Sequence, residues 1–252
     1  MLSTSNRHGQ LIIYSSNKPY PIIIIQSIIF ISMNMLSFAG FGQNNDWANT
    51  LRYAAANRSL PAPTIGEKRV VFIGNSITEG WKMTDSLFFT NRPYVNRGIS
   101  GQTTPQMLIR FRPDVIALKP AVVVILAGIN DIAENTGPIS LEAIAGNIAS
   151  MAELARTNGI RVVLCSVLPA NRFPWRPSIL PAEKVIALNN MLRGFAAKNK
   201  IVFVDYYSAM VDDKQGLPEK YAQDGIHPTI EGYKVMEPLV EAGIKKALKR
   251  KK

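Results

Sequence analysis

The segment Val70–Thr78 has the sequence Val-Val-Phe-Ile-Gly-Asn-Ser-Ile-Thr. Its first four residues are β-branched or aromatic without interruption, which is typical of a strand covered on both faces. The Gly-Asn-Ser that follows can end the strand and begin a helix, because Asn and Ser are favoured helix caps. We therefore expect a buried strand, a tight turn and a helix that places Ser76 at its start.

Four further apolar segments share this strand-like character. The predicted strands are Arg69–Ile73, Tyr94–Ile99, Ala121–Ala127, Ile160–Leu168 and Ile201–Asp205. Helical patterns separate several of them along the chain. Such alternation predicts an α/β fold with one parallel sheet, right-handed crossovers and helices on both faces.

Three helical patterns are clear in the second half of the chain. Apolar residues recur at steps of three and four over Leu141–Leu154 and again over Ala182–Lys198. Thr229–Lys249 is the last helical stretch. We expect Pro238 to kink or divide it, because proline removes a backbone N–H.

The first 42 residues differ in character from the rest of the chain. Lys18 precedes the apolar stretch Tyr20–Ile31, and small residues follow as far as Gly42. A basic region, a short apolar run and a small-residue exit are typical of a secretory signal peptide. We expect an exported protein, periplasmic or secreted, with an uncleaved membrane anchor as the alternative.

The remainder is expected to form one domain. Residues 43–67 are predicted to hold a helix over Asp46–Asn57 and a proline-containing linker over Ser59–Gly66, and residues 68–252 the domain itself with a basic tail. The 252-residue chain is 47% hydrophobic and 19% charged, which is typical of a globular protein. A chain of this length can bury one full hydrophobic core.

The formal net charge of +11 is concentrated at the C-terminal end, where six basic residues lie within Lys245–Lys252. A solvated helix end explains this tail best, and contact with an anionic membrane surface is the less favoured alternative. Nucleic-acid binding is not expected, since basic and aromatic residues are not interleaved elsewhere. The single cysteine, Cys165, lies in an apolar run and is predicted to be buried.

No cofactor is expected. The sequence has no Cys/His cluster or carboxylate cage that would indicate a metal, and no glycine-rich phosphate-binding motif that would indicate a nucleotide. The partner we expect is a small-molecule or glycan ester, and the oligomeric state is left open.

Chemistry-bearing residues fall at the ends of the predicted strands. Ser76 follows the first strand, Gly98 ends the second, Asn130 follows the third, and His227 precedes the last helix. In open α/β sheets ligands bind beyond the carboxyl ends of the strands, so these residues should converge. Each of these residues could also be an ordinary cap or turn residue. We infer a functional site from their combination.

That combination provides the four functions needed for acyl transfer. Ser76 is the predicted nucleophile, His227 its general base and Asp224 the acid that orients the imidazole. The predicted oxyanion donors are the N–H groups of Ser76 and Gly98 and the side-chain amide of Asn130. The only other histidine, His8, lies ahead of the predicted leader.

Four sequence blocks carry a family resemblance. They are Gly74-Asn75-Ser76-Ile77-Thr78, Asn96-Arg97-Gly98-Ile99-Ser100-Gly101, Gly128-Ile129-Asn130-Asp131 and Asp224-Gly225-Ile226-His227-Pro228. In this order the chain resembles the SGNH (GDSL-type) hydrolases. The resemblance implies a flavodoxin-like three-layer α/β/α sandwich around a five-stranded parallel sheet. Asn75 departs from the family pattern, which has an aspartate before the serine.

Other residues have weaker roles in this interpretation. Asp205 is the alternative triad acid, while Glu79 and Asp131 are expected to be structural. Trp81 and Trp175 could line a substrate pocket, where an aromatic ring can stack on a sugar or pack against an acyl chain.

Together these observations predict an exported serine esterase that forms an acyl-enzyme and removes short acyl groups, acetyl in particular, from carbohydrate. One alternative is a lipolytic acylhydrolase that acts on lysophospholipids, platelet-activating-factor-like lipids or thioesters. Another is a catalytically silent carbohydrate-binding protein on the same scaffold.

Overall fold

The computed structural model describes residues 46–90 and 92–249. The predicted leader lies outside these residues. The described chain contains a five-stranded parallel sheet in the order β2-β1-β3-β4-β5. Its strands are β1 (Val70–Gly74), β2 (Tyr94–Gly98), β3 (Val122–Leu126), β4 (Arg161–Cys165) and β5 (Val202–Val204). The predicted sheet is confirmed, with β4 and β5 shorter than expected.

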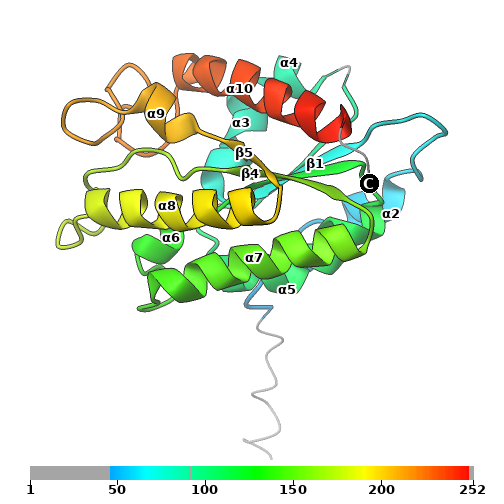
Figure 1. The fold of residues 1–252 in the computed structure, drawn as a ribbon, viewed down its shortest axis with the longest axis horizontal. Helices are drawn as coiled ribbons and strands as arrows, with labels where there is room; N and C mark the ends of the chain where they lie inside the picture. The colour runs from blue at the N-terminus through cyan, green and yellow to red at the C-terminus, as the bar shows by residue number, and fades with distance from the viewer. Residues whose placement is uncertain (1–45, 91, 250–252) are drawn as a thin grey trace, which may run out of the picture. The chain divides into compact units, whose positions relative to one another are not determined.

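Helices cover both faces of the sheet, as Figure 1 shows. One face carries α3 (Ser76–Thr84), α4 (Ser86–Phe89) and α10 (Ile230–Lys249), and the other carries α5 (Thr104–Asp114), α7 (Leu141–Thr157) and α8 (Ala182–Lys198). Shorter helical segments are α2 (Ala54–Ser59), η1 (Ile116–Leu118), α6 (Ile129–Ile132) and α9 (Tyr206–Met210). This is the three-layer α/β/α architecture that the sequence predicted.

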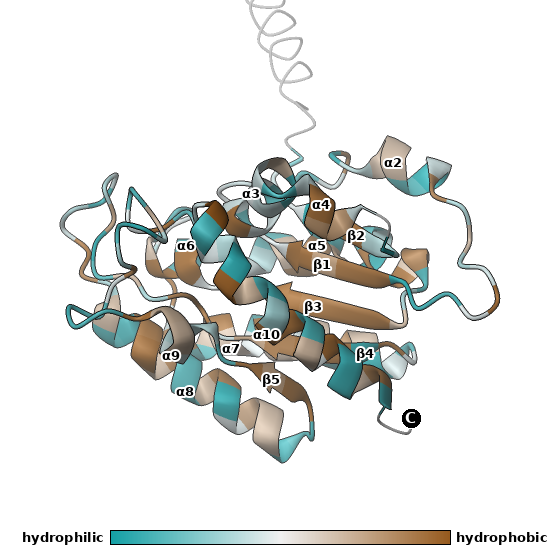
Figure 2. Cartoon of the chain, turned by 90° about the horizontal axis from the view of Figure 1, so that it is seen from above, coloured by the Kyte–Doolittle hydropathy of each residue, from teal (hydrophilic) through white to brown (hydrophobic). Residues whose placement is uncertain are grey.

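The strands are the most buried part of the molecule. Every residue of β1 and β3 is buried, and Figure 2 shows these strands as hydrophobic ribbons between the helices. Strands covered on both faces exclude water from each side, which explains their uninterrupted apolar sequence. Cys165 is also fully buried, as expected, and burial raises the pKa of its thiol to about 12.

The register of the sheet brings three loops to one edge. Gly74, the last residue of β1, pairs with Gly98 of β2 and with Leu126 of β3. The segments that follow these strands therefore start side by side. They contain Ser76 and Asn130, so the sheet brings these two residues of the predicted site to the same edge.

The N-terminal helix is shorter than predicted. The expected helix over Asp46–Asn57 is wrong, because turns occupy most of that range and α2 begins only at Ala54. Asn49 has a left-handed backbone (φ +54°), and the Asp46 carboxylate accepts the N–H groups of Thr50 and Leu51. A carboxylate that holds local N–H groups competes with the helical bonding pattern.

Helix α10 runs continuously through Pro238, so the expected division is not observed. Proline removes the hydrogen bond to the carbonyl four residues earlier, here that of Lys234. Both residues are exposed, so water can satisfy this carbonyl. No helix within the described residues is long and apolar enough to span a membrane.

Gly243 permits close packing of α10 on the sheet, and its replacement tests that contact. A Cβ built on Gly243 would lie 2.5 Å from Cγ2 of Val204 in β5. Gly243→Ala should therefore lower the free energy of unfolding by about 1–3 kcal/mol, as overpacked cores do. Urea denaturation measures this quantity.

Gly194 is the matched control, since it lies in α8 with nothing within 4 Å of a built Cβ. Gly194→Ala should stabilise the protein by about 0.5–1 kcal/mol, because alanine is the better helix former. Similar effects of the two substitutions would contradict the packing described for α10.

Candidate active site

Three side chains form a continuous hydrogen-bonded chain at the carboxyl edge of the sheet. The Ser76 Oγ lies 2.9 Å from His227 Nε2, and His227 Nδ1 lies 2.6 Å from Asp224 Oδ2. With the ring proton on Nδ1 and donated to Asp224, Nε2 can accept from the serine hydroxyl. This arrangement can move the hydroxyl proton onto the imidazole as the oxygen attacks a carbonyl carbon.

The strand-to-helix turn at the end of β1 positions the serine. Asn75 caps α3 by accepting the N–H of Ile77 on its Oδ1 (3.0 Å), so Ser76 begins the helix. A carboxylate could accept the same bond, which explains why asparagine supports the turn in place of the family aspartate. The Asn75 Nδ2, however, is buried without a hydrogen-bond partner among the described residues.

The histidine is held by a tight loop before α10. Asp224 Oδ1 accepts the N–H groups of Ile226 (2.9 Å) and His227 (2.8 Å), so one carboxylate fixes both the backbone and the ring. Gly225 has φ +80°, a conformation that favours glycine. Partial burial opposes ionisation of Asp224, but the hydrogen bonds from His227 and Ile226 outweigh it and lower the pKa of this carboxyl.

The alternative acid, Asp205, is engaged elsewhere. Its carboxylate caps α9 through Ser208 N (3.1 Å) and accepts from Arg193 (2.9 Å). Among the described residues, the carboxylate on the ring of His227 is that of Asp224. The geometry therefore favours Asp224, as the sequence spacing predicted.

Glu79 and Asp131 support the loops around the site. Glu79 accepts from the N–H of Ser100 (2.8 Å) and from Arg52 (3.1 Å). Asp131 accepts the N–H of Thr104 (2.9 Å) at the start of α5, and its burial raises the pKa of this carboxyl. Both carboxylates accept hydrogen bonds from backbone N–H groups, in agreement with the structural role expected for them.

Asn130 lies on the same edge, directly after β3. Its side chain is 4% exposed and its Nδ2 donates to the carbonyl of Gln102 (3.0 Å). Gly128, with φ +120°, turns the chain sharply before it. An amide nitrogen carries two hydrogens, so one remains for an oxyanion while the other fixes the side chain.

Gly98 is not available as an oxyanion donor. Its N–H donates to the Oδ1 of Asn96 (2.9 Å), so the predicted role of this residue is wrong. Its lack of a side chain has a packing reason instead. A Cβ on Gly98 would lie 2.1 Å from the backbone nitrogen of Glu79, where β2 meets α3.

Gly101 is a better candidate for this donor than Gly98. The N–H groups of Ile99, Ser100 and Gln102 all have acceptors, whereas that of Gly101 has none among the described residues. Gly101 has φ +77°. The carbonyl of the next residue, Gln102, accepts a hydrogen bond from the Asn130 side chain, so Gly101 is adjacent to the residue that positions Asn130. Both glycines are visible in the sequence, but only the hydrogen bonds distinguish them.

A buried arginine ties these loops together. Arg110, 0% exposed in α5, donates to the carbonyls of Gly74 (3.1 Å) and Arg97 (2.9 Å) and to Gln102 Oε1. Asp114 balances its charge at 3.0 Å. Burial lowers the pKa of Arg110 while Asp114 works in the opposite direction. No sequence pattern around Arg110 indicates this position.

The two tryptophans have different surroundings. Trp81 is 1% exposed and stacks on Phe88 and Tyr233, so its predicted place in a substrate pocket is wrong. Trp175 is 43% exposed, and its ring centroid lies 6.4 Å from that of His227. Only Trp175 is therefore positioned to meet a substrate.

Comparison with known proteins agrees with this geometry. The model of the GDSL-like lipase/acylhydrolase family matches residues 72–235. The chain belongs to this family. It is a GDSL-family esterase, a carboxylic-ester hydrolase, as the sequence predicted.

Two relatives of this GDSL esterase are themselves named as esterases. It is 30% identical over 171 residues to esterase TesA of Pseudomonas aeruginosa, covering 66% of this chain and 78% of TesA. It is 26% identical over 230 residues to an acetylxylan esterase of Xylanibacter ruminicola, covering 75% of this chain but only 45% of that protein.

A solved structure of a GDSL-like lipase from Bacteroides thetaiotaomicron VPI-5482 is similar as well, at 53% identity with a TM-score of 0.77. That match covers 79% of this chain and 98% of the other.

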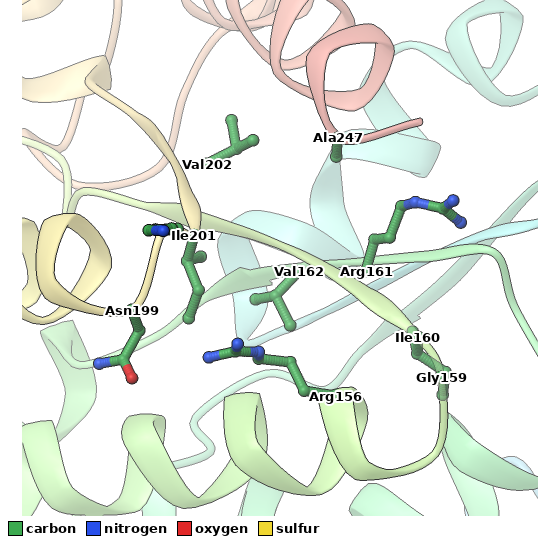
Figure 3. A pocket seen from close by; sticks show the side chains of 10 residues that line it. Arg156, Gly159, Ile160, Arg161, Val162, Asn199, Ile201, Val202 and Ala247 are labelled. Carbon is green, nitrogen blue, oxygen red and sulfur yellow. The ribbon is translucent and has the colours of Figure 1, made fainter. Parts of the chain in front are cut away.

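A cavity of about 650 Å³ in the GDSL esterase is lined by residues around the starts of two strands (Figure 3). It is formed where β4 and β5 begin, at the opposite end of the strands from Ser76. Arg156 of α7 and Asn199 before β5 are among its lining residues. A smaller cavity of about 190 Å³ lies between α6 and α7. Neither is lined by a triad residue, and the side chains of His227 and Asp224 are 43% and 42% exposed.

Replacement of Asn130 tests the oxyanion geometry of the GDSL esterase. Asn130→Ala should lower kcat by about 10²- to 10³-fold, as loss of one preorganised donor does, with a smaller effect on KM. Steady-state kinetics on 4-nitrophenyl acetate measure both constants. A loss of less than tenfold in kcat would remove Asn130 from the site.

Proposed function

We propose that this GDSL esterase hydrolyses short acyl esters, acetyl groups on carbohydrate in particular, through an acyl-enzyme on Ser76. The observation that carries the proposal is the chain from Ser76 Oγ through the His227 ring to Asp224, at 2.9 and 2.6 Å. A serine with its base and an orienting carboxylate is the arrangement that nucleophilic acyl transfer requires.

In the first half-reaction Ser76 Oγ attacks the ester carbonyl while His227 Nε2 takes the hydroxyl proton. Asp224 stabilises the imidazolium that results. Collapse of the tetrahedral intermediate breaks the bond to the leaving alcohol, which receives the proton from His227, and the acyl group stays on Ser76. In the second half, water attacks this ester with the same base, releases the acid and restores the hydroxyl.

Three donors surround the developing oxyanion in this proposal. They are the N–H groups of Ser76 and Gly101 and the Nδ2 of Asn130. The N–H of Ser76 lies at the start of α3, where backbone donors have no partner within the helix and the helix dipole favours negative charge. Donors that are already oriented stabilise the transition state without reorganisation.

The openness of the site supports a short acyl group. The side chains of His227 and Asp224 are 43% and 42% exposed, so the reacting groups lie at the surface, where a small acyl group on a bulky sugar can reach them. Exposed Trp175 beside His227 offers a flat face for a sugar ring. The similarity to an acetylxylan esterase is consistent with the same substrate class.

Export is part of the same proposal. A carbohydrate polymer is met outside the cytoplasm, and the basic, apolar and small-residue regions of residues 1–42 follow the order of a signal peptide.

A chain-length series tests the substrate class. With 4-nitrophenyl acetate, butyrate and octanoate, kcat/KM should be highest for acetate, and acetylated xylooligosaccharides should lose acetate. Ser76→Ala and His227→Ala should each lower kcat by roughly 10⁴- to 10⁶-fold. Ser150→Ala is the control, because Ser150 lies on α7 and bonds only the carbonyl of Gly146.

A preference for octanoate or for lysophospholipid would overturn the carbohydrate assignment and establish the lipolytic alternative. Full activity in Ser76→Ala would overturn the mechanism. Absence of hydrolysis on every ester would leave the silent carbohydrate-binding alternative.

A further inference from the structure

The loop between β4 and α8 forms one rim of the active site. It is anchored by the Nδ2 of Asn171, which donates to the carbonyl of Lys214 (3.1 Å), and by Phe173, which is 0% exposed. Arg176 donates to the carbonyl of Glu134 (3.5 Å), in the segment that follows Asn130. These contacts fix the loop to the segment around Lys214 and to the segment that follows Asn130.

Arg172 in this loop lies alongside the catalytic histidine's own loop. A Cβ built on Gly225 would be 3.7 Å from the Arg172 Nε, so the guanidinium borders the turn between Asp224 and His227. Arg172 is exposed, and its side chain has no hydrogen bond or ion pair within the described residues. It is a cation at the site that the protein itself does not neutralise.

Three carboxylates near the opening have partners of their own. Asp224 binds the His227 ring, and Glu79 binds Arg52 and Ser100. Glu134 faces Lys184 at 3.9 Å. None of these three carboxylates bonds Arg172, so its guanidinium donors are available to a substrate anion.

Trp175 lies three residues further along the same loop. Its ring packs against buried Phe173 at 5.3 Å and lies 6.4 Å from the ring of His227, with 43% of the residue exposed. An anchored but exposed indole can stack on an apolar sugar face with little loss of side-chain entropy. Arg172 and Trp175 thus place a charge and a flat surface beside the catalytic loop.

We propose that Arg172 and Trp175 form a subsite for an acidic sugar, so that the preferred substrate is an acetylated sugar that carries a carboxylate. The inference rests on the proposed function, since it names the sugar whose acetyl ester Ser76 attacks. The planar guanidinium of Arg172 pairs with the carboxylate, since its donors match the spacing of two carboxylate oxygens. Trp175 supports the ring.

A matched pair of substrates tests this subsite. The substrates are a methyl glucuronoside and a methyl glucoside acetylated at the same hydroxyl, with released acetate as the readout. Wild-type protein should show a kcat/KM about three- to tenfold higher for the acidic sugar, as one exposed charge-assisted hydrogen bond allows. Added salt should reduce this preference, because it screens exposed charges.

Arg172→Gln should bring the ratio of the two kcat/KM values close to one, and Trp175→Ala should lower kcat/KM for both sugars more than for 4-nitrophenyl acetate. Arg112→Gln is the control and should keep the wild-type ratio. Arg112 is an exposed arginine in the last turn of α5, a helix that begins at the catalytic edge and runs away from it.

The outcomes separate this inference from the proposed function. Equal hydrolysis of both sugars by the wild type, or an unchanged ratio in Arg172→Gln, overturns the subsite and leaves the acetyl-sugar activity in place. Hydrolysis of neither sugar, with activity on lysophospholipid, overturns both proposals. A high ratio that only Arg172→Gln abolishes supports the subsite.

Discussion

A single buried guanidinium joins the segments on which the active site depends. Arg110 donates to the last residue of β1, to β2 and to the loop after β2, from a side chain that water does not reach. Burying a charge is costly unless partners surround it, and here Asp114 and three oxygen acceptors do so. Gln102 extends the network, because its carbonyl fixes Asn130. The serine turn, the Gly101 loop and Asn130 are thereby held as one unit.

The catalytic histidine is held independently of that unit. Its loop is stabilised by Asp224, which binds two N–H groups and the imidazole at once. The nucleophile thus comes from the first strand and its base from the segment before the last helix. Their contact at 2.9 Å forms only when the whole sheet and α10 are in place. The side chains of His227 and Asp224 remain 43% and 42% exposed, which suits the proposed bulky sugar with a small acyl group.

Much of this could be predicted from the sequence, because short-range patterns determine it. The uninterrupted apolar run at β1 indicates a strand covered on both faces, and the Asp224–His227 spacing places carboxylate and imidazole in one turn. Helix α5 is absent from the predicted helices, although its first residues carry a recognisable helix-start pattern. The Gln106 side chain accepts the N–H of Thr103, a capping interaction with a recognisable Thr-x-x-Gln pattern.

Other features depend on particular hydrogen bonds and packing contacts that no simple residue pattern reveals. Gly98 and Gly101 are distinguished by which N–H is already bonded, and Trp81 and Trp175 by how far each is buried. The position of Arg110 follows from three oxygen acceptors that lie between eight and 36 residues away in the sequence. The N-terminal segment forms turns instead of a helix, because Asp46 binds the N–H groups that a helix would need.

The central claim is that the Ser76 hydroxyl, activated by His227, carries the acyl group. The most direct measurement is labelling of the protein with a fluorophosphonate probe, followed by mass spectrometry of the peptides. The account predicts one adduct, on Ser76, that forms far more slowly in His227→Ala. An active esterase that remains unlabelled, or that carries its adduct on another residue, would contradict it.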